Sequence, residues 1–296
     1  MISICIPIYN FDVRPLVKEL SEQITLQKEE FFEIILIDDA SDKSFREKNL
    51  ELNNICQYIQ LEQNVGRSKI RNLFLKYTTQ SYLLFLDCDG IIDDNLHFIS
   101  NYLKAAQQNL DVVCGGRVYT ENCPSDAVSL NWKYGKEVES PAIVRSFMSN
   151  NFMNKRSVLE QVKFDESLTT YGHEDTLFGI DLKRKNIQVS IINNPVLNNH
   201  LEENEIYLEK NISSIKNLIS LIHFNKITSE DFNSIRLLKS AHQLEKFCLD
   251  KIFLSLYNLL QPFILSNLKG DNPNLTYFSL FKLGEFLAQK KESTKL

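Results

Sequence analysis

The stretch Tyr82–Gly90 reads YLLFLDCDG and places two aspartates and a glycine directly after five aromatic or aliphatic residues. A short, continuously apolar run of this kind indicates a strand that is buried on both faces of a sheet. Two earlier runs, Ile2–Ile8 and Phe31–Ile37, have the same character and lead into Tyr9-Asn10 and Asp38-Asp39. Three buried strands that each end in polar residues therefore form the framework of the predicted fold.

Between these runs the apolar residues follow a helical spacing. The helices that we expect are Val13–Ile24, Lys43–Asn54, Ile70–Tyr77 and Leu96–Ala106. Two further short strands are expected at Tyr58–Leu61 and Asp111–Cys114. Strands that alternate with helices form a mainly parallel sheet covered by helices on both faces, an α/β/α sandwich. Ligands bind such sheets beyond the carboxyl ends of the strands, so the polar residues at the strand ends are expected to share one binding edge.

The regular alternation stops after Gly116. Residues 117–200 combine short extended pieces with one helix, and the chain from Glu203 onward is expected to be mostly helical. Strand signals cease near residue 212. The predicted organisation is therefore an α/β domain over residues 1–212, with a mixed, mainly parallel sheet, and a C-terminal helical extension over residues 213–296.

The composition is that of an ordinary globular protein, with 43% apolar and 24% charged residues among 296. The net charge of −5 argues against a nucleic-acid-binding protein, which usually carries a basic surplus, but it allows a local nucleotide site. None of the six cysteines forms a C-x-x-C pair, which argues against a zinc ribbon or a redox motif. With no secretory signal pattern and no run of about 20 apolar residues, we expect a cytoplasmic protein.

Asp87 and Asp89 form a D-x-D pair behind the strand Tyr82–Leu86. In an extended segment, residues i and i+2 point the same way, so the two carboxylates are expected to share one hard cation, Mg²⁺ or Mn²⁺. Phosphate oxygens of a ligand would complete the coordination shell. The alternative is a pair of solvated acids in a turn.

Two further strand-end groups are candidates for nucleotide contacts. Asp38 or Asp39 could accept a hydrogen bond from a base or from ribose hydroxyls, or could only cap the next helix. Gly66 at a helix start lets the backbone approach a ligand, and a helix N-terminus favours anions. Arg71 in that helix could meet a phosphate or pair with the strand-end aspartates.

Glu174 and Asp175 precede a helical stretch. Adjacent residues do not share a helix face, so one of them could be a general base and the other an acceptor of a substrate hydrogen bond. The alternative is a pair of acids that complements the helix dipole. His200 lies in a polar loop and could add an imidazole ligand to a Mn²⁺ site, or could simply be exposed.

In order and rough spacing, six stretches of the chain together resemble the inverting, nucleotide-sugar-dependent glycosyltransferases of family 2, which have the GT-A fold. The stretches are SICIPIYN (3–10), ILIDDASD (35–42), NVGRSKIRN (64–72), YLLFLDCDG (82–90), FDESL (164–168) and GHEDTL (172–177). The resemblance covers about residues 1–210. The segment after residue 212 matches no pattern of the family.

The resemblance implies a nucleotide site at the first strand ends. Pro7, Tyr9 and Asp39 are similar to the nucleobase pocket, with Asn10 nearby, and Arg71 resembles the arginine beside the nucleotide. The nucleobase is expected to be uracil, so that the donor is a UDP-sugar.

The resemblance also implies the metal and the catalytic residues. Asp87 and Asp89 are similar to the ligands of the metal and the ribose-diphosphate, Asp89 being the direct ligand of Mn²⁺ or Mg²⁺, and His200 is similar to a histidine that some members place on the metal. Asp175 resembles the catalytic base, and Glu174 resembles an acceptor contact.

The implied activity is the transfer of a hexosyl group to an acceptor hydroxyl of a glycan or a lipid-linked molecule, in the synthesis of a bacterial surface polysaccharide or glycoconjugate. A sugar-phosphate nucleotidyltransferase is one alternative, although the first strand lacks the glycine-rich basic loop that would hold a triphosphate. A non-catalytic nucleotide-sugar-binding subunit is another, against which the complete set of acidic residues argues.

The C-terminal region adds a long apolar segment, Ile252–Leu265, which has no formal charge and contains Pro262. It is too short to span a bilayer. Three interpretations remain open: a helical cap on the catalytic domain, a homodimer interface, and peripheral contact with the inner face of the cell membrane.

Overall fold

The computed structural model describes residues 1–27, 32–93, 95–140 and 147–293. The chain divides into two compact units. The first, which we call the sheet unit, comprises Met1–Thr120, Val138–Thr169 and Glu174–His200. The second, which we call the helical unit, comprises Glu121–Glu137, Thr170–His173 and Leu201–Leu296.

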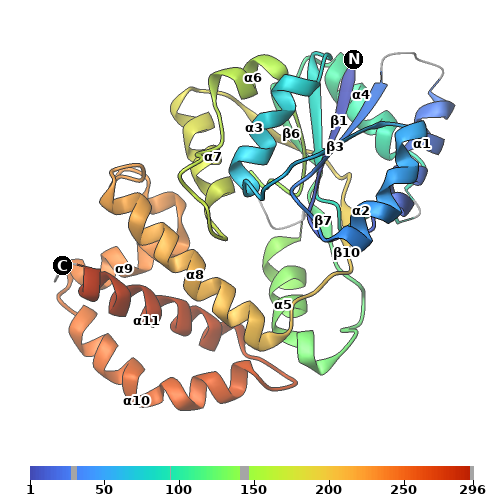
Figure 1. The fold of residues 1–296 in the computed structure, drawn as a ribbon. Coiled ribbons are helices and arrows are strands. Elements are labelled where there is room, and N and C mark those ends of the chain that lie inside the picture. The colour runs from blue at the N-terminus through green and yellow to red at the C-terminus, as the bar shows by residue number, and fades with distance from the viewer. Residues whose placement is uncertain (28–31, 94, 141–146, 294–296) are drawn as a thin grey trace. The chain divides into compact units, whose positions relative to one another are not determined.

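Within the described ranges, the sheet unit contains a seven-stranded sheet with the strand order β3-β2-β1-β4-β8-β6-β9 (Figure 1). Its strands are β1 (Ile2–Ile8), β2 (Phe32–Asp38), β3 (Gln57–Gln60), β4 (Tyr82–Leu86), β6 (Val112–Cys114), β8 (Asn151–Lys155) and β9 (Val189–Ile191). Strand β8 runs antiparallel to both of its neighbours, and the other pairs are parallel. A small second sheet joins β5 (Gly90–Ile91), β10 (Val196–Asn198) and β7 (Arg117–Val118). Phe31, the predicted first residue of the second strand, lies outside the described residues.

Helices cover both faces of the large sheet, which is why its strands are apolar without alternation. The helices of the sheet unit are α1 (Arg14–Leu26), α2 (Lys43–Asn49), α3 (Arg67–Tyr77), α4 (Phe98–Gln107), α6 (Arg156–Gln161) and α7 (Glu174–Arg184), with the short helix η1 (Leu50–Asn54) after α2. One face packs on α1 and α4, and the other packs on α3, α6 and α7. The predicted α/β/α sandwich with a mixed, mainly parallel sheet is confirmed.

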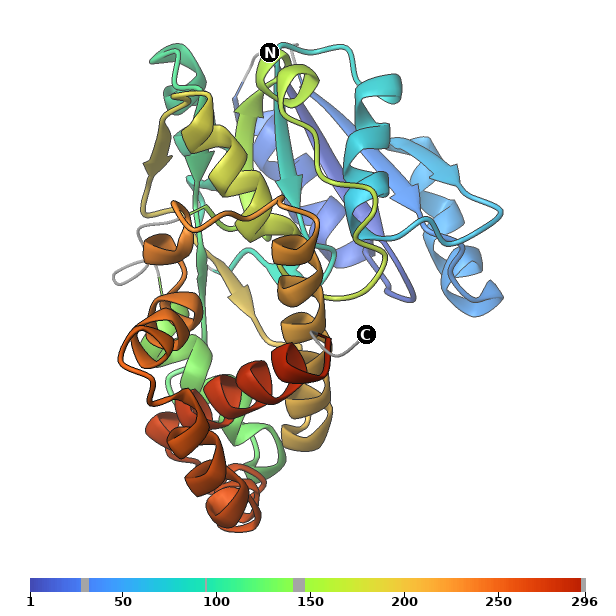
Figure 2. The same cartoon turned by 90° about the vertical axis from the view of Figure 1, so that its left-hand side faces the viewer.

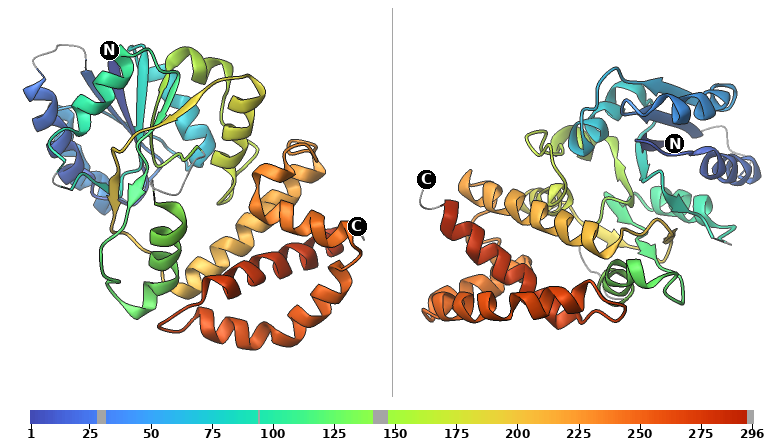
Figure 3. Two further views of the ribbon diagram at one scale, coloured as in Figure 1. Left: turned by 180° about the vertical axis from the view of Figure 1, so that it is seen from behind. Right: turned by 60° about the horizontal axis from the view of Figure 1, so that its bottom comes forward.

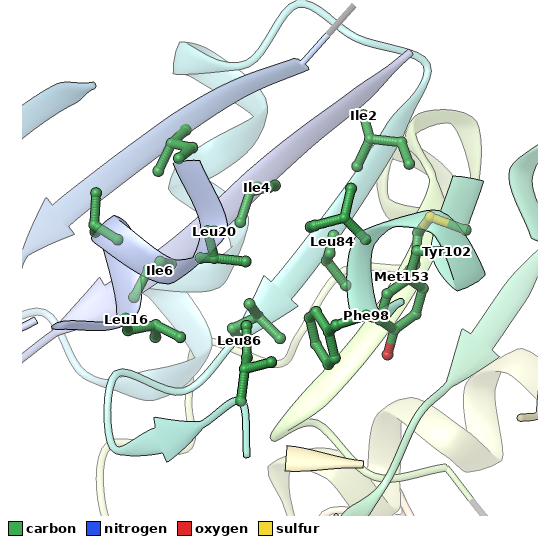
Figure 4. Close-up of a cluster of buried hydrophobic side chains, with 14 of the residues drawn as sticks. Ile2, Ile4, Ile6, Leu16, Leu20, Leu84, Leu86, Phe98, Tyr102 and Met153 are labelled. Carbon is green, nitrogen blue, oxygen red and sulfur yellow. The ribbon is translucent and has the colours of Figure 1, made fainter. Parts of the chain in front are cut away.

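Side-chain alternation along β1 and β4 divides the core between these two faces. Figure 4 shows the first cluster, in which Ile4 and Leu84 of the sheet meet Leu20 of α1 and Phe98 of α4. On the opposite face Phe85 packs among residues of α3, α6 and α7. Asp87 follows Phe85 by two residues and therefore points toward the α3 side, where Arg71 lies.

The helical unit contains α5 (Ser129–Tyr134), α8 (Asn204–His223), α9 (Arg236–Lys246), α10 (Asp250–Leu268) and α11 (Leu275–Ser293), with the short helices η2 (Asp126–Val128), η3 (Gly135–Glu139) and η4 (Phe232–Ser234) nearby in sequence. Helix α11 packs against α8, α9 and α10, as Figure 2 and Figure 3 show. The predicted helical C-terminal region is confirmed. The boundary predicted at residue 212 falls inside α8, and the division into domains 1–212 and 213–296 stays a prediction.

Helix α10 has one buried and one exposed face. Tyr257 and Leu268 are buried, whereas Leu256, Leu259 and Phe263 are 55%, 76% and 61% exposed. Packing inside the helical unit therefore accounts for only one side of this apolar helix. Among the described helices none alone is long and apolar enough to span a membrane, although the bent pair α9–α10 satisfies the length and composition together.

A loop at residues 170–172 is held closely against α8. The Asn217 amide donates from Nδ2 to the carbonyl oxygens of Thr170, Tyr171 and Gly172 at 3.2, 3.1 and 3.2 Å, and its Oδ1 accepts from Thr170 Oγ1 at 2.8 Å. Gly172 has a φ of +107° and lies against Ser214 of the same helix. The backbone of the loop therefore packs directly on α8, with no space for a side chain at Gly172.

The close approach at Gly172 predicts that Gly172→Ala destabilises the protein. A Cβ there would lie 2.4 Å from Ser214 Oγ, and the positive φ disfavours an L-residue. Overpacking and backbone strain together should lower the free energy of unfolding by about 2–4 kcal/mol, measured by urea denaturation. Gly270→Ala is the control, because its nearest neighbours would be 3.4 and 3.5 Å away. Equal stability of the two variants would contradict the close packing.

Candidate active site

The carboxyl ends of the three buried strands meet at one edge of the sheet. Strand β1 lies between β2 and β4, and Ile8 is paired with Asp38. The Asp39 N–H donates to the carbonyl of Ile8 at 2.8 Å. The segments that follow β1, β2 and β4 are therefore neighbours, as parallel topology predicts.

The residues after β1 divide between exposed and structural positions. Tyr9 is 56% exposed, and Pro7 is half-buried inside the strand. Asn10 has a φ of 50° and braces the next strand end: its N–H donates to Ser41 Oγ at 2.9 Å, and its Oδ1 accepts from the Asp42 N–H at 2.7 Å. Tyr9 thus offers a free aromatic face, while the Asn10 side chain is already used in the fold.

Asp38 is a structural residue. Its side chain is fully buried, with Oδ1 accepting from the Ser41 N–H and Oδ2 from the Tyr58 hydroxyl, both at 2.7 Å. Of Asp38 and Asp39, Asp38 is therefore the one whose side chain stabilises the turn after β2 and the contact with β3.

Asp39 connects the end of β2 to the start of α3. Its Oδ1 accepts from the Val65 N–H at 2.6 Å and its Oδ2 from the Gly66 N–H at 3.1 Å. Burial raises the pKa of Asp39, and these two hydrogen bonds oppose that rise. Because a carboxylate oxygen can accept more than one hydrogen bond, Asp39 keeps acceptor capacity for a ligand. Gly66 has a φ of +82° and precedes α3 directly, which explains the glycine there.

Arg71 is buried and bound to the first aspartate of the D-x-D pair. Its Nη2 lies 3.0 Å from Asp87 Oδ1, and its guanidinium stands over the Phe164 ring. Of the two predicted roles for Arg71, pairing with a strand-end aspartate is therefore observed. This pair fixes the orientation of the Asp87 carboxylate at the sheet edge.

Asp87 and Asp89 lie in a turn, and the prediction of an extended segment is wrong. The Asp87 N–H donates to the Asn150 carbonyl at 2.9 Å, and the chain then turns so that the Gly90 N–H meets the Asp87 carbonyl at 3.1 Å. The turn is needed because β5 begins at Gly90 and pairs with β10 in the other sheet. Burial raises the pKa of Asp89 and the negative charge of Asp87 raises it further, so the two carboxylates still lie close together.

His200 is exposed two residues after the end of β10, with its ring edge-on to Phe11 at 5.9 Å. Its charge lowers the pKa of Asp89, which places it near that carboxylate. A cavity of about 390 Å³ is lined by Asp89 and His200 together with residues of α1. No group of three metal-ligating side chains is assembled in the described part of the chain. Two adjacent carboxylates with an imidazole nearby fit a Mn²⁺ or Mg²⁺ ion whose shell is completed by phosphate oxygens and water.

Glu174 and Asp175 occupy the first turn of α7 and have different surroundings. Glu174 is buried, with Oε1 at 3.8 Å from Arg67 and 4.0 Å from Arg71. Asp175 Oδ1 accepts from the Thr176 N–H at 2.7 Å. Burial and the charge of Glu174 raise the pKa of Asp175 to about 6, against the lowering influence of Arg71 and Arg117. A carboxyl group whose pKa lies near neutral pH is suited to proton transfer.

The model of the family described as Glycosyl transferase family 2 matches residues 3–165, more than half of the chain. The chain belongs to glycosyl transferase family 2. The resemblance drawn from the six sequence stretches is thereby confirmed.

Solved structures show the fold of this family 2 glycosyltransferase. The mannosyltransferase PcManGT from Pyrobaculum calidifontis, solved with GDP-Man and Mn²⁺, superposes with a TM-score of 0.61 at 14% identity over 99% of this chain and 86% of that one. TarS 1–349 from S. aureus gives a TM-score of 0.48 at 16% identity, over 99% and 91% of the two chains. The likeness to PcManGT is one of fold alone, and the predicted GT-A architecture is confirmed.

A curated relative of this family 2 glycosyltransferase is the minor teichoic acid biosynthesis protein GgaB of Bacillus subtilis (strain 168). It is 28% identical over 195 residues, which are 62% of this chain and 21% of the relative. The chain therefore spans about a fifth of the length of that relative.

Sequence reasoning assigned no role to Asn150 or Arg67, which the structure places beside Asp87 and Glu174 at this edge. The rule for carboxyl ends applies to parallel strands, but β8 is antiparallel and brings its amino end to the same edge. The two amides Asn150-Asn151 before the apolar Phe152 were therefore a usable signal only once the direction of β8 was known.

Proposed function

We propose that this glycosyltransferase transfers a hexosyl group from a UDP-sugar to an acceptor hydroxyl with inversion at the anomeric carbon. The observation that carries the proposal is the position of Glu174 and Asp175 in the first turn of α7, where Glu174 lies 4.0 Å from the Arg71 guanidinium that pairs with Asp87. A base and a nucleotide-binding group at one edge are what a single in-line displacement needs.

In the proposed mechanism each group acts on a defined part of the reaction. Tyr9 and Pro7 contact the base, and Asp39 accepts a hydrogen bond from the base or the ribose. Arg71 orients Asp87 at the phosphate side. Asp175 takes the proton from the acceptor hydroxyl as its oxygen attacks the anomeric carbon, the bond to the diphosphate breaks, and the nucleoside diphosphate leaves with the electron pair. Glu174 orients the acceptor, and its charge keeps the Asp175 carboxyl basic.

We propose further that Asp89, Asp87 and His200 hold Mn²⁺ or Mg²⁺. The raised pKa of Asp89 supports this assignment, because two crowded carboxylates gain from a positive charge between them. A bound divalent cation stabilises the negative charge that collects on the leaving diphosphate.

The acceptor that we propose belongs to a bacterial surface polysaccharide, with a teichoic-acid-type polymer as the first candidate. The name of the GgaB relative supports this choice. The proposal is tested by a thermal-shift screen of UDP-, GDP- and dTDP-sugars with Mn²⁺, because a ligand that binds the folded state raises its melting temperature. Free nucleoside diphosphate as the product confirms transfer, whereas release of pyrophosphate would indicate a nucleotidyltransferase and binding without turnover a non-catalytic subunit.

We also propose that the exposed face of α10 binds an anionic lipid surface. Leu256, Leu259 and Phe263 form the apolar part of this face. The helix carries no acidic residue after Asp250, and the exposed Lys251 lies at its start. Apolar residues beside lysines suit anionic membranes, and such contact would bring the enzyme to a lipid-linked acceptor.

The expected result is that the chain floats with phosphatidylglycerol-containing liposomes, and that the double variant Leu259→Glu, Phe263→Glu lowers the bound fraction about tenfold or more. Leu26→Glu is the control, since Leu26 of α1 is 68% exposed in the sheet unit. An intact chain that stays with the buffer would contradict membrane docking. A dimer that becomes monomeric in the double variant would identify a second copy of the chain as the occupant of this face.

A further inference from the structure

The side chain of Asn150 is buried at the candidate site with its polar atoms unused. It is 8% exposed, and neither Oδ1 nor Nδ2 has a hydrogen-bond partner among the described residues. Buried amides are almost always paired, because a buried polar group without a partner costs about 1–3 kcal/mol of stability. An amide kept in this state beside a catalytic site is suited to a ligand.

Strand geometry shows where this amide points. Asn150 directly precedes β8, opposite Asp87, whose N–H donates to the Asn150 carbonyl at 2.9 Å. Side chains alternate along the strand, and the Asn151 side chain meets the Tyr102 hydroxyl of α4. The Asn150 side chain therefore lies on the opposite side, the face of the sheet on which α3 packs.

Charged groups of the proposed mechanism contact the residue that precedes Asn150. Arg71 Nη2 lies 3.5 Å from the carbonyl of Ser149 and donates to Asp87 as well. Glu174 stands 4.0 Å from the same guanidinium. In the proposed mechanism these charges serve the phosphate, the cation and the proton, which leaves the neutral Asn150 amide for the hydroxyl groups of the sugar.

We propose that the Asn150 amide binds hydroxyl groups of the transferred sugar and selects among donor sugars. The inference rests on the proposed function, because it needs a nucleotide-sugar donor at this edge. An amide offers one acceptor oxygen and two N–H donors, which is the set that two neighbouring sugar hydroxyls require. A site that pairs with a substrate hydroxyl discriminates against a sugar in which that hydroxyl points elsewhere.

The test compares the intact chain with Asn150→Leu, which keeps the side-chain shape and removes its polar atoms. Binding of UDP and of UDP-Glc, UDP-Gal, UDP-GlcNAc and UDP-GalNAc is measured by calorimetry with Mn²⁺. We expect affinity for the best-bound sugar nucleotide to fall about tenfold, as for one or two lost hydrogen bonds, and the preference among the four to shrink. Affinity for UDP alone should not change.

A stability measurement separates this role from a structural one. If the Asn150 amide has no protein partner, Asn150→Leu should melt at or above the wild-type temperature, because an apolar group replaces an unpaired polar one. Asn151→Leu is the matched control, since the neighbouring Asn151 is buried, accepts from the Tyr102 hydroxyl, and donates from Nδ2 to the carbonyls of Gly116 and Asn194 at 2.9 Å. That variant should melt lower and keep the wild-type sugar preference.

The outcomes keep the two proposals apart. An Asn150→Leu variant that melts lower while keeping its sugar preference would show a structural amide and overturn the inference alone. An equal loss of affinity for UDP would also overturn it, since the amide would then serve the nucleotide. A wild type that binds none of the UDP-, GDP- or dTDP-sugars would overturn the proposed function, and the inference with it.

Discussion

Asp175→Asn is expected to bind the donor normally and to transfer sugar about 10²–10⁴ times more slowly, the usual effect of removing a general base. The asparagine keeps the shape and an oxygen for the Thr176 N–H, so the start of α7 should remain in place. What it loses is the ability to take the proton from the acceptor hydroxyl. Single-turnover transfer and calorimetric donor binding measure the two effects separately.

The pH dependence gives an independent check on Asp175. Burial and Glu174 raise its pKa to about 6, so the carboxylate form that can accept a proton is lost as the pH falls through that value. The wild-type kcat/KM should therefore decline tenfold per pH unit on the acid side, and the residual activity of Asp175→Asn should not show that limb.

Asp181→Asn is a suitable control for this substitution. Asp181 lies on the same helix and pairs with Arg184 at 3.0 Å on its outer side, so its loss should leave transfer unchanged. An equal loss of donor affinity in Asp175→Asn would mean that Asp175 holds the donor. Full activity would move the base elsewhere, with Glu174 as the first candidate.

Asp89→Ala is expected to abolish transfer and the Mn²⁺-dependent part of UDP binding. The pKa of Asp89 is raised by burial and by Asp87, which means that the charged carboxylate is unfavourable in the folded chain when no cation is bound. At neutral pH, above the usual pKa of an aspartate, its removal should therefore leave the metal-free protein at least as stable as before. In the proposed role, the Asp89 side chain would serve the cation at the expense of the stability of the metal-free protein.

The measurement for Asp89→Ala is a Mn²⁺ titration of the UDP-induced thermal shift, together with turnover. Asp93→Ala serves as the control, because Asp93 is an exposed acid four residues further along the chain. Near-normal turnover of Asp89→Ala in Mn²⁺ would show that the cation binds elsewhere or is not required.

The strands that are buried on both faces could be predicted from the sequence. The strands Ile2–Ile8 and Tyr82–Leu86 were found to the residue, because a run covered on both faces is apolar throughout. The direction of β8 was not predictable, since its pairing with Leu83–Leu86 is set by residues about 70 positions away. Local pattern carries no information on which way such a strand runs.

The site was predictable as a set of residues but not as a set of contacts. Parallel topology brought Asp39, Asp87 and Tyr9 to one edge, as expected. The use of Asn10 as a brace for Ser41 and Asp42 depends on a loop that begins 31 residues later, and no spacing rule reports it. The same holds for Asp39, whose partners Val65 and Gly66 lie beyond the next strand.

The fit between Gly172 and helix α8 restricts how this protein can exchange parts with its relatives. Three backbone carbonyls of the loop at residues 170–172 share one amide, Asn217, and the loop has no room for a Cβ against Ser214. A chimaera that replaced only residues 201–296 would set a foreign helix against the native loop. The helical unit also includes residues 121–137, which contribute α5. Three separate stretches of the gene must therefore travel together for a graft of this unit to fold.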